Sequence, residues 1–251
     1  MFKKLFLILF LIFFQSSKVY SSEFTFEVYG LKINFIKVKV NFAQNKFFSI
    51  INSQGLIGYF VEFSNIIQTT FNSSNNNLNY FFNIKKKDKE KIYQYVKQDG
   101  KILNDNTQLK KGKNYKEIQR MDLAGTVDPL TAVHQILFNN NLDHQCGSRA
   151  KIYDGDDVYE VYLSPRKLDK LSVDYKKQNF QIIFSCRLNY KAISGHKFER
   201  EQKLNSRYLD VYFSKINNSI IPVYFETKST FIKLNMYLSP ILTPGLITQD
   251  Q

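Results

Sequence analysis

The sequence predicts a mainly β protein: a single twisted antiparallel sheet rolled into a half-barrel or spiral β-roll, with one packed central α-helix. Three observations predict this class. Apolar and polar residues alternate with period two along most of the chain, turn signals such as Asp99-Gly100 separate the runs, and one capped segment after residue 128 has helical spacing. The length after the leader fits one domain, placed at residues 22–239.

The first residues have the three parts of a secretory signal peptide. Lys3 and Lys4 form a positive start, residues 5–14 are an uninterrupted apolar run, and a short polar stretch leads to a predicted cleavage site after Ser21. The run is shorter than the roughly 20 residues that a membrane-spanning helix needs, so a retained anchor is the alternative. We therefore expect residues 1–21 to be removed and the protein to be periplasmic.

The first half of the domain is expected to form hairpins. Strand patterns occur at residues 24–28, 31–42, 47–51, 80–84 and 92–96. The alternation slips by one residue at Asn34-Phe35, which predicts a β-bulge. Residues 55–70 fit a short buried helix or a two-faced strand, 71–79 an Asn-rich loop, and 101–113 an edge strand or loop.

The helix is expected to begin at Asp128, the predicted N-cap, because its carboxylate can accept hydrogen bonds from the free N–H groups of the first turn. Pro129 suits the next position, where no N–H is needed. The helix is expected to end at residues 139–141, and its inward stripe to consist of Leu130, Val133 and Leu137.

The second half again predicts strands and turns, at residues 152–153, 158–163, 171–175, 180–190, 207–213, 220–227 and 230–238. Pro222 has no N–H to donate, so it is expected near a strand start or at a sheet edge. Residues 240–251 carry Pro, Thr and Gln and are predicted to be a flexible tail.

Cys146 and Cys186 are the only two cysteines, and in an exported protein an even count favours a disulfide. It would close a loop of about 40 residues and stabilise the fold by roughly 3–4 kcal/mol. The alternative makes Cys146 a nucleophile or, with His144, part of a metal site. That pair supplies two ligands, and zinc needs three or four.

Motifs of catalytic and cofactor sites are absent from the sequence, which contains no GxGxxG, Walker, HExxH, GxSxG or CxxC pattern. We therefore predict no metal and no cofactor and assign no catalytic residue. His134 borders the inward stripe of the helix and is expected to be a spacer with one satisfied hydrogen bond. His196 follows Gly195 in a predicted turn and is expected to be exposed.

The chain is basic: its formal charge is +13, and +10 without Lys3, Lys4 and Lys18. Basic surfaces bind nucleic acid, anionic lipid headgroups or acidic polysaccharide. Because an exported protein does not meet nucleic acid, we do not expect it as a partner. Peripheral contact of the basic surface with an anionic membrane is a possible partner interaction instead. The one dense run, residues 85–91, fits a solvated hairpin or loop.

Two aromatic-rich faces can hold an acyl chain between sheet and helix, or simply fill the core. One face has Phe24, Phe26 and Val28, and the other has Tyr208, Tyr212 and Tyr224.

Several motifs occur together in one order. A strand pair surrounds YGLK (29–32), DPL (128–130) opens the helix, a Cys precedes YDG (153–155), and CRLNY (186–190), ISG (193–195) and IPVY (221–224) follow. In this order they resemble the bacterial domain-of-unknown-function family 3108, exported periplasmic proteins, over about residues 23–238. The resemblance implies a β-rich spiral or rolled sheet and no assigned activity.

The sequence thus favours a non-catalytic protein that binds or scaffolds envelope components, either lipid, glycan or a partner protein. The alternative is a hydrolase or transferase acting on envelope polymers. An open apolar cavity between sheet and helix would support binding. A cleft with paired carboxylates, or with a histidine beside an activated nucleophile, would support an enzyme.

Overall fold

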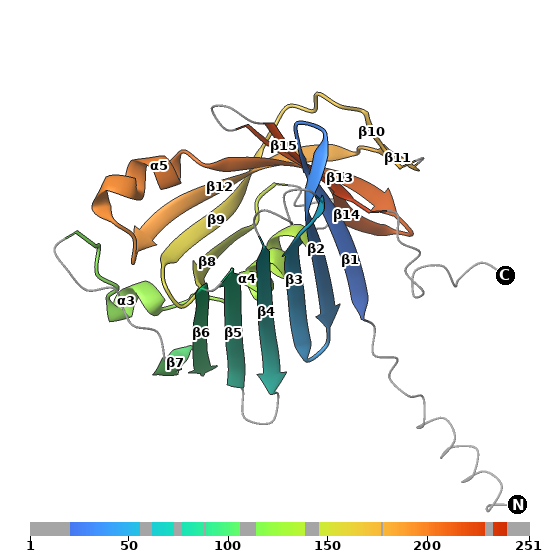
Figure 1. The fold of residues 1–251 in the computed structure, drawn as a ribbon. Coiled ribbons are helices and arrows are strands. Elements are labelled where there is room, and N and C mark those ends of the chain that lie inside the picture. Colours follow the sequence, from blue (N-terminus) through green and yellow to red (C-terminus); the bar gives the residue numbers. More distant parts are fainter. Residues whose placement is uncertain are drawn as a thin grey trace, which may run out of the picture.

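The computed structural model describes residues 21–55, 62–72, 77–87, 89–105, 114–138, 146–176, 178–228 and 233–239. Their strands form one antiparallel sheet of 13 strands, in the order β7-β6-β5-β4-β3-β2-β1-β15-β14-β13-β12-β9-β8, and a separate hairpin, β10-β11. Figure 1 shows the sheet curling around a short central helix. The predicted fold class is confirmed, and the sheet is open because its edge strands β7 and β8 do not pair.

The first seven strands form a meander in which each strand pairs with the next. Their bounds are Ser22–Gly30 (β1), Ile33–Ala43 (β2), Lys46–Ser53 (β3), Phe63–Asn72 (β4), Asn77–Lys86 (β5), Lys89–Gln98 (β6) and Lys101–Asp105 (β7). The loop expected at 71–79 is shorter than predicted, because β4 continues through Asn72 and β5 starts at Asn77.

The predicted bulge is present in the first hairpin. Val28 of β1 pairs with Ile36 and Tyr29 pairs with Asn34, so Phe35 is the extra residue. One extra residue changes which side chains face the core. After the bulge, Val40 and Phe42 are the buried residues of β2.

The second half of the sheet follows the helix. Its strands are Arg149–Tyr153 (β8), Val158–Pro165 (β9), Phe184–Ser194 (β12), Tyr208–Ile216 (β13), Ser219–Lys228 (β14) and Lys233–Leu238 (β15). β15 pairs with β1, so the last strand joins the second half to the first.

The strand predicted at 180–190 is wrong, because two strands occupy that range. β11 (Gln178–Gln181) pairs only with β10 (Ser172–Tyr175), and β12 begins at Phe184. Between them the N–H of Ile182 donates to Leu171, whereas that of Ile183 donates to Phe213 of β13. The chain therefore changes sheets within two residues.

Pro222 lies near the start of β14, as predicted. It is opposite Phe213 of β13 and comes before Tyr224, where the pairing of β14 with β15 begins. The pairing register shifts there, between Tyr212 and Phe213. At a bulge one ladder hydrogen bond is already missing, so a residue without an N–H is tolerated.

The central helix starts at the predicted N-cap: the carboxylate of Asp128 accepts the N–H groups of Leu130 and Thr131 at 3.0 and 3.1 Å. It also accepts the hydroxyl of Thr69 in β4 at 2.6 Å, which ties the helix to the first half of the sheet. The α-helical part, α4, is Pro129–Val133, and a π-helical turn, His134–Phe138, continues it.

The inward stripe of the helix differs from the prediction. Leu130 and Leu137 are buried, but Val133 is only partly buried, and Ala132 and Ile136 are the most buried side chains. The π turn widens the helix and rotates the residues that follow it. The remaining helices, with no buried residue, are Arg120–Leu123 (α3), the 3₁₀ turn Phe198–Arg200, and Glu201–Asn205 (α5).

Side chains, rather than backbone pairing, bring the two ends of the sheet together. The hydroxyl of Tyr95 in β6 donates to the carbonyl of Tyr153 in β8 at 2.9 Å. Tyr93 and Lys91, also in β6, reach the carboxylate of Asp156 at 2.8 and 3.2 Å. This seam fixes the width of the rolled sheet.

One row of rings runs across β1, β10 and β13 to β15. We call it the tyrosine belt, and it consists of Tyr29, Tyr175, Tyr212, Tyr224 and Tyr237. Neighbouring rings lie close, with Tyr175 stacked on Tyr237 at 4.7 Å and Tyr212 at 5.2 Å from Tyr224. Beside the belt, the buried carboxylate of Asp210 binds Arg187 at 2.8 Å and Arg166 at 3.0 Å.

Candidate functional site

A cavity of about 380 Å³ lies between the sheet and the central helix, at the end where β1 and β3 begin. We call it the phenylalanine cavity. Strands β1, β2 and β3 supply one wall, the π turn the second, and the end of β13 with the start of β14 the third. Its lining residues are Ser22, Phe24, Phe42, Ala43, Gln44, Phe47, His134, Phe138, Ile216, Ser219 and Ile221.

Aromatic rings in contact with one another form the apolar centre of the lining. Phe138 lies 4.6 Å from Phe24 and 5.0 Å from Phe42, between ring centroids. Phe42 and Phe47 meet edge to face at 5.1 Å. Because each ring is held by its neighbours, the cavity does not depend on a single side chain.

The π turn brings two lining residues to the same side. His134 and Phe138 begin and end this turn, and both face the cavity, while Ile136 and Leu137 between them are buried in the core. π turns inside helices occur frequently at functional sites. The sequence reasoning did not find this arrangement, because residue spacing alone does not distinguish a π turn from an α turn.

The described lining of the cavity contains no charged residue, although the chain carries a net charge of +13. His134 is its one titratable group. The ring lies 4.9 Å from both Phe42 and Phe47, and burial lowers the pKa of His134 below its ordinary value. At neutral pH the imidazole is therefore uncharged, and it can donate one hydrogen bond and accept another.

The histidine predictions have different outcomes. His134 was expected to be a spacer, but it lines the cavity. His144 lies outside the described residues. His196 was expected to be exposed, which is wrong: it is 3% exposed, and its Nε2 lies 3.5 Å from the carboxylate of Glu201.

The burial of His196 follows from the residue before it. A Cβ on Gly195 would come within 2.5 Å of the carbonyl oxygen of Asp156, so only glycine lets the chain pass this close to the 154–157 turn. Gly195 suggested an exposed turn, but it is packed against the 154–157 turn. The next residue, His196, is therefore buried.

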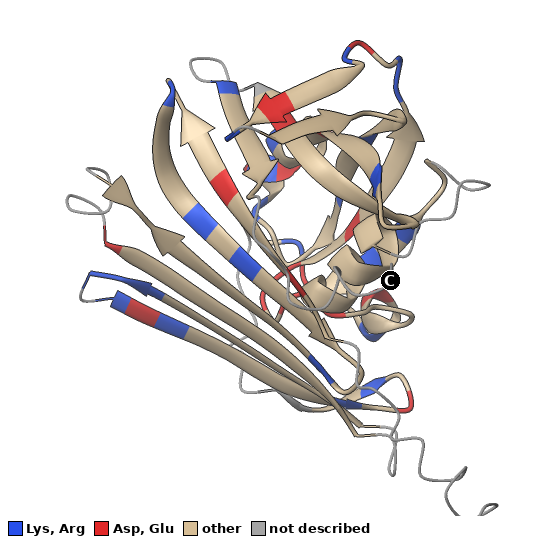
Figure 2. Ribbon diagram, turned by 90° about the vertical axis from the view of Figure 1, so that its right-hand side faces the viewer, with Lys and Arg blue, Asp and Glu red and all other residues tan. Residues whose placement is uncertain are grey.

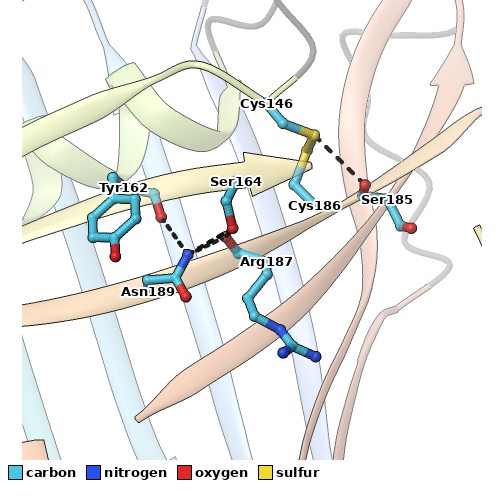
Figure 3. Close-up of a disulfide and its surroundings, with 7 residues drawn as sticks. All are labelled: Cys146, Tyr162, Ser164, Ser185, Cys186, Arg187 and Asn189. Carbon is cyan, nitrogen blue, oxygen red and sulfur yellow. Dashed lines mark hydrogen bonds between the residues drawn. A yellow bond between two sulfur atoms is a disulfide. The ribbon is translucent and has the colours of Figure 1, made fainter. Parts of the chain in front are cut away.

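Cys146 and Cys186 form a disulfide, with Cα atoms 5.6 Å apart (Figure 3). Cys186 is fully buried in β12, and Cys146 follows the helix. Figure 3 shows the amide of Asn189, on the same strand, donating to Ser164 at 2.8 Å and to the carbonyl of Arg187 at 3.0 Å. The bond leaves neither sulfur as a thiol nucleophile or metal ligand.

The two predicted aromatic faces lie on opposite sides of the sheet. Phe24 and Phe26 belong to the core side, and Phe24 reaches the cavity. Tyr212 and Tyr224 belong to the tyrosine belt, where their hydroxyls donate to Asp169 and Glu226 at 2.8 and 2.7 Å. They are therefore used for packing and hydrogen bonding away from the cavity.

No group of three or more His, Cys, Asp or Glu among the described residues could hold a metal ion. No helix in this part of the chain is both long enough and apolar enough to cross a membrane.

Comparison with known proteins gives structural likeness without a family. No family model matches the chain, and no curated protein sequence matches it. A beta-barrel-like protein of the domain of unknown function DUF1849 from Brucella abortus aligns with a TM-score of 0.47 and 10% identity, over 88% of this chain and 96% of that one. A DUF1329 family protein from Desulfovibrio piger aligns with a TM-score of 0.22 and 9% identity, over 92% and 88%.

Proposed function

We propose that this chain is an exported, non-catalytic protein of the cell envelope that binds the apolar part of a neutral ligand, such as a lipid acyl chain, in the phenylalanine cavity. The observation that carries the proposal is the cavity itself, about 380 Å³ in volume and lined by aromatic side chains. Small-molecule sites fall at roughly 300–1,000 Å³ and are mostly apolar with a few polar groups.

The chemistry of the lining selects for a neutral guest. A buried charge without a partner is strongly unfavourable, and the described lining residues offer no charged partner. The polar groups present are the imidazole of His134 and the side chains of Ser22, Gln44 and Ser219. They suit a hydroxyl or ester carbonyl beside an apolar chain better than a carboxylate or phosphate.

Two observations support export. Residues 1–21 have the signal-peptide pattern. The two cysteines form a disulfide, and disulfides persist in oxidising compartments. The order of motifs also supports a relationship with family 3108. We propose lipid and not glycan as the ligand because the described lining is mainly apolar and contains no carboxylate that could accept hydrogen bonds from sugar hydroxyls.

The proposal can be tested with the neutral fluorescent probe N-phenyl-1-naphthylamine and the mature protein. Ser219 is exposed, begins β14 and lies at the cavity, so Ser219→Trp should block it. Ser172, equally exposed at the start of β10, provides the matched control Ser172→Trp. We expect Ser219→Trp to weaken probe binding by about tenfold or more, which corresponds to at least about 1.4 kcal/mol.

Equal binding by Ser219→Trp and the wild type would refute the proposed site. The melting temperature of each variant shows whether it is folded, so that a loss of binding can be assigned to the cavity. His134→Phe is a second, isosteric probe: it should retain N-phenyl-1-naphthylamine but weaken binding of a long-chain alcohol, which needs a hydrogen-bond partner.

A further inference from the structure

A second concave site lies at the other end of the same sheet face. This basic groove, about 630 Å³ in volume, is formed by β9, β12, β13 and β14 with α5 and the segment that follows it. Its apolar floor consists of the half-buried side chains Val161, Leu188 and Leu209. Figure 1 shows α5 near the end of β12, which is where the groove opens.

The basic groove is separate from the phenylalanine cavity. β13 touches the groove with Tyr208 at its start and the cavity with Ile216 at its end. At about 3.3 Å per residue these positions are roughly 25 Å apart. Val211 and Phe213, both fully buried, fill the core between them, so the two sites do not form one channel.

Two cations lie at the groove. Lys203 and Arg207 are both exposed lining residues, and no aspartate or glutamate belongs to the described lining. Neither cation forms an ion pair with any described residue, whereas Arg187 nearby is paired with Asp210. Figure 2 shows that Lys and Arg are otherwise spread over many strands and turns.

The positions of the aromatic residues add to this picture. Burial raises the pKa of Tyr190 above its ordinary value, and the carboxylates of Asp157 and Asp154 add to that rise. The positive charge of Arg207 opposes it, so the guanidinium and both carboxylates lie within electrostatic reach of the groove wall. The ring of Tyr208, also in the lining, already carries the guanidinium of Arg187 at 4.1 Å from its centroid. Cations and apolar surface thus lie side by side.

We propose that the basic groove binds a single amphipathic anion. Its apolar part would lie on Val161, Leu188 and Leu209, and its phosphate, sulfonate or carboxylate head between Lys203 and Arg207. Charge complementarity supports this occupant, since cations without acidic partners favour an anion and charge-assisted hydrogen bonds to guanidinium are strong. This site is independent of the neutral ligand proposed for the phenylalanine cavity.

The test uses the mature protein and 1-anilinonaphthalene-8-sulfonate, a fluorescent amphipathic anion. Lys203→Gln with Arg207→Gln removes both groove cations. The matched control, Lys191→Gln with Lys215→Gln, removes two exposed lysines of β12 and β13 that do not line the groove. We expect the groove variant to lose about tenfold in affinity and the control to retain it.

Competitors define the class of ligand. n-Decyl phosphate should displace the probe at a much lower concentration than inorganic phosphate, and neutral decyl maltoside should not displace it. Lysophosphatidylglycerol, added as a further competitor, distinguishes a lipid from a smaller phosphate ester as the source. Unchanged binding by the groove variant, an equal loss in the control, or equal competition by inorganic and decyl phosphate would overturn the proposal.

The two proposed sites can fail separately. Ser219→Trp should reduce binding of N-phenyl-1-naphthylamine and leave the anionic probe bound, and the groove variant should do the reverse. If both probes respond to the same variant, the basic groove is not an independent site and the inference is wrong.

Discussion

The two halves of the sheet are stabilised in different ways. β2 to β7 form a meander in which sequence neighbours pair, and their buried Tyr80 and Tyr95 form a small separate cluster with Tyr153 and Val158. The second half has the disulfide, the tyrosine belt and the paired carboxylate of Asp210, so both of its faces are covered. The phenylalanine cavity lies where these halves meet, with walls from both. We infer that the second half is the rigid frame and that the first half can adjust to a ligand.

Among the predicted changes, loss of the disulfide should lower the free energy of unfolding most. Replacing Cys146 and Cys186 by Ser removes a crosslink between residues 40 apart. In the chain-entropy model the free energy of unfolding should fall by about 4 kcal/mol. Urea unfolding with and without reductant measures it. A loss below about 1 kcal/mol would contradict the idea that the second half depends on this bond.

Substitution of Asp210 should have the second-largest effect on the free energy of unfolding. Its carboxylate is 4% exposed and pairs with Arg166 and Arg187, so Asp210→Asn removes the counter-charge of Arg187 and leaves Arg166 paired with Asp169 alone. We expect a loss of about 3 kcal/mol, since removing one partner of a buried ion pair is strongly destabilising.

The matched change in the first half is Glu90→Gln, because Glu90 is exposed in the β5–β6 hairpin and accepts a hydrogen bond from Asn83. It should cost under about 0.5 kcal/mol. If the two substitutions prove equally costly in urea unfolding, the halves do not differ as described.

The seam should respond to pH. Burial raises the pKa of Asp154 to about 6, above the roughly 3.9 of an unfolded chain. Between these values the folded state binds more protons, so this carboxyl stabilises the fold as pH falls and destabilises it as pH rises through 6. Asp154→Asn should therefore raise stability more at pH 7 than at pH 5, by about 1 kcal/mol.

Asp169, beside the tyrosine belt, has a pKa shifted in the opposite direction to that of Asp154. The hydrogen bond from Arg166 holds the pKa of Asp169 well below its ordinary value. Its contribution is present at pH 5 and pH 7 and is lost as the pH falls through the folded value, so Asp169→Asn should cost the same at both. Urea unfolding at the two pH values separates the carboxyls, and a larger gain for Asp154→Asn at pH 5 would contradict the assignment.

Two stacked tyrosines of the first half, Tyr80 and Tyr95, provide a further comparison, and their rings lie 4.8 Å apart. The hydroxyl of Tyr95 donates to Tyr153, whereas the buried hydroxyl of Tyr80 has no hydrogen-bond partner among the described residues. Tyr95→Phe should cost about 1 kcal/mol, and Tyr80→Phe should be neutral or stabilising. Thermal unfolding of the two variants measures the difference. An equal loss of stability in both would mean that the hydrogen bond from Tyr95 to Tyr153 does not stabilise the seam.

The fold could be predicted from local signals, and its exceptions have physical causes. Alternation identified most strands, the slip at Asn34-Phe35 located the bulge, and Asp128 identified the helix start. The split near Ile182 was missed because the buried residues Phe180, Ile182 and Phe184 alternate across it without a break. The bulge beside Pro222, where Val223 of β14 is the extra residue, was not predicted either.

The site was much harder to predict. Phe42, Phe47 and Phe138 are ordinary core residues by pattern, and only the tertiary fold brings them around one cavity. His196 was placed outside because a Gly-His pair is typical of a turn, and the close approach of the 154–157 segment cannot be read from the sequence. Chemistry that depends on distant segments was therefore not visible in motifs.

The central claim is that the phenylalanine cavity holds a neutral apolar ligand, and native mass spectrometry of the protein purified from the periplasm tests it most directly. The account predicts a co-purifying neutral lipid on the wild type and on Ser172→Trp, and none on Ser219→Trp. The same adduct on Ser219→Trp, or no adduct on any of the three proteins, would contradict it.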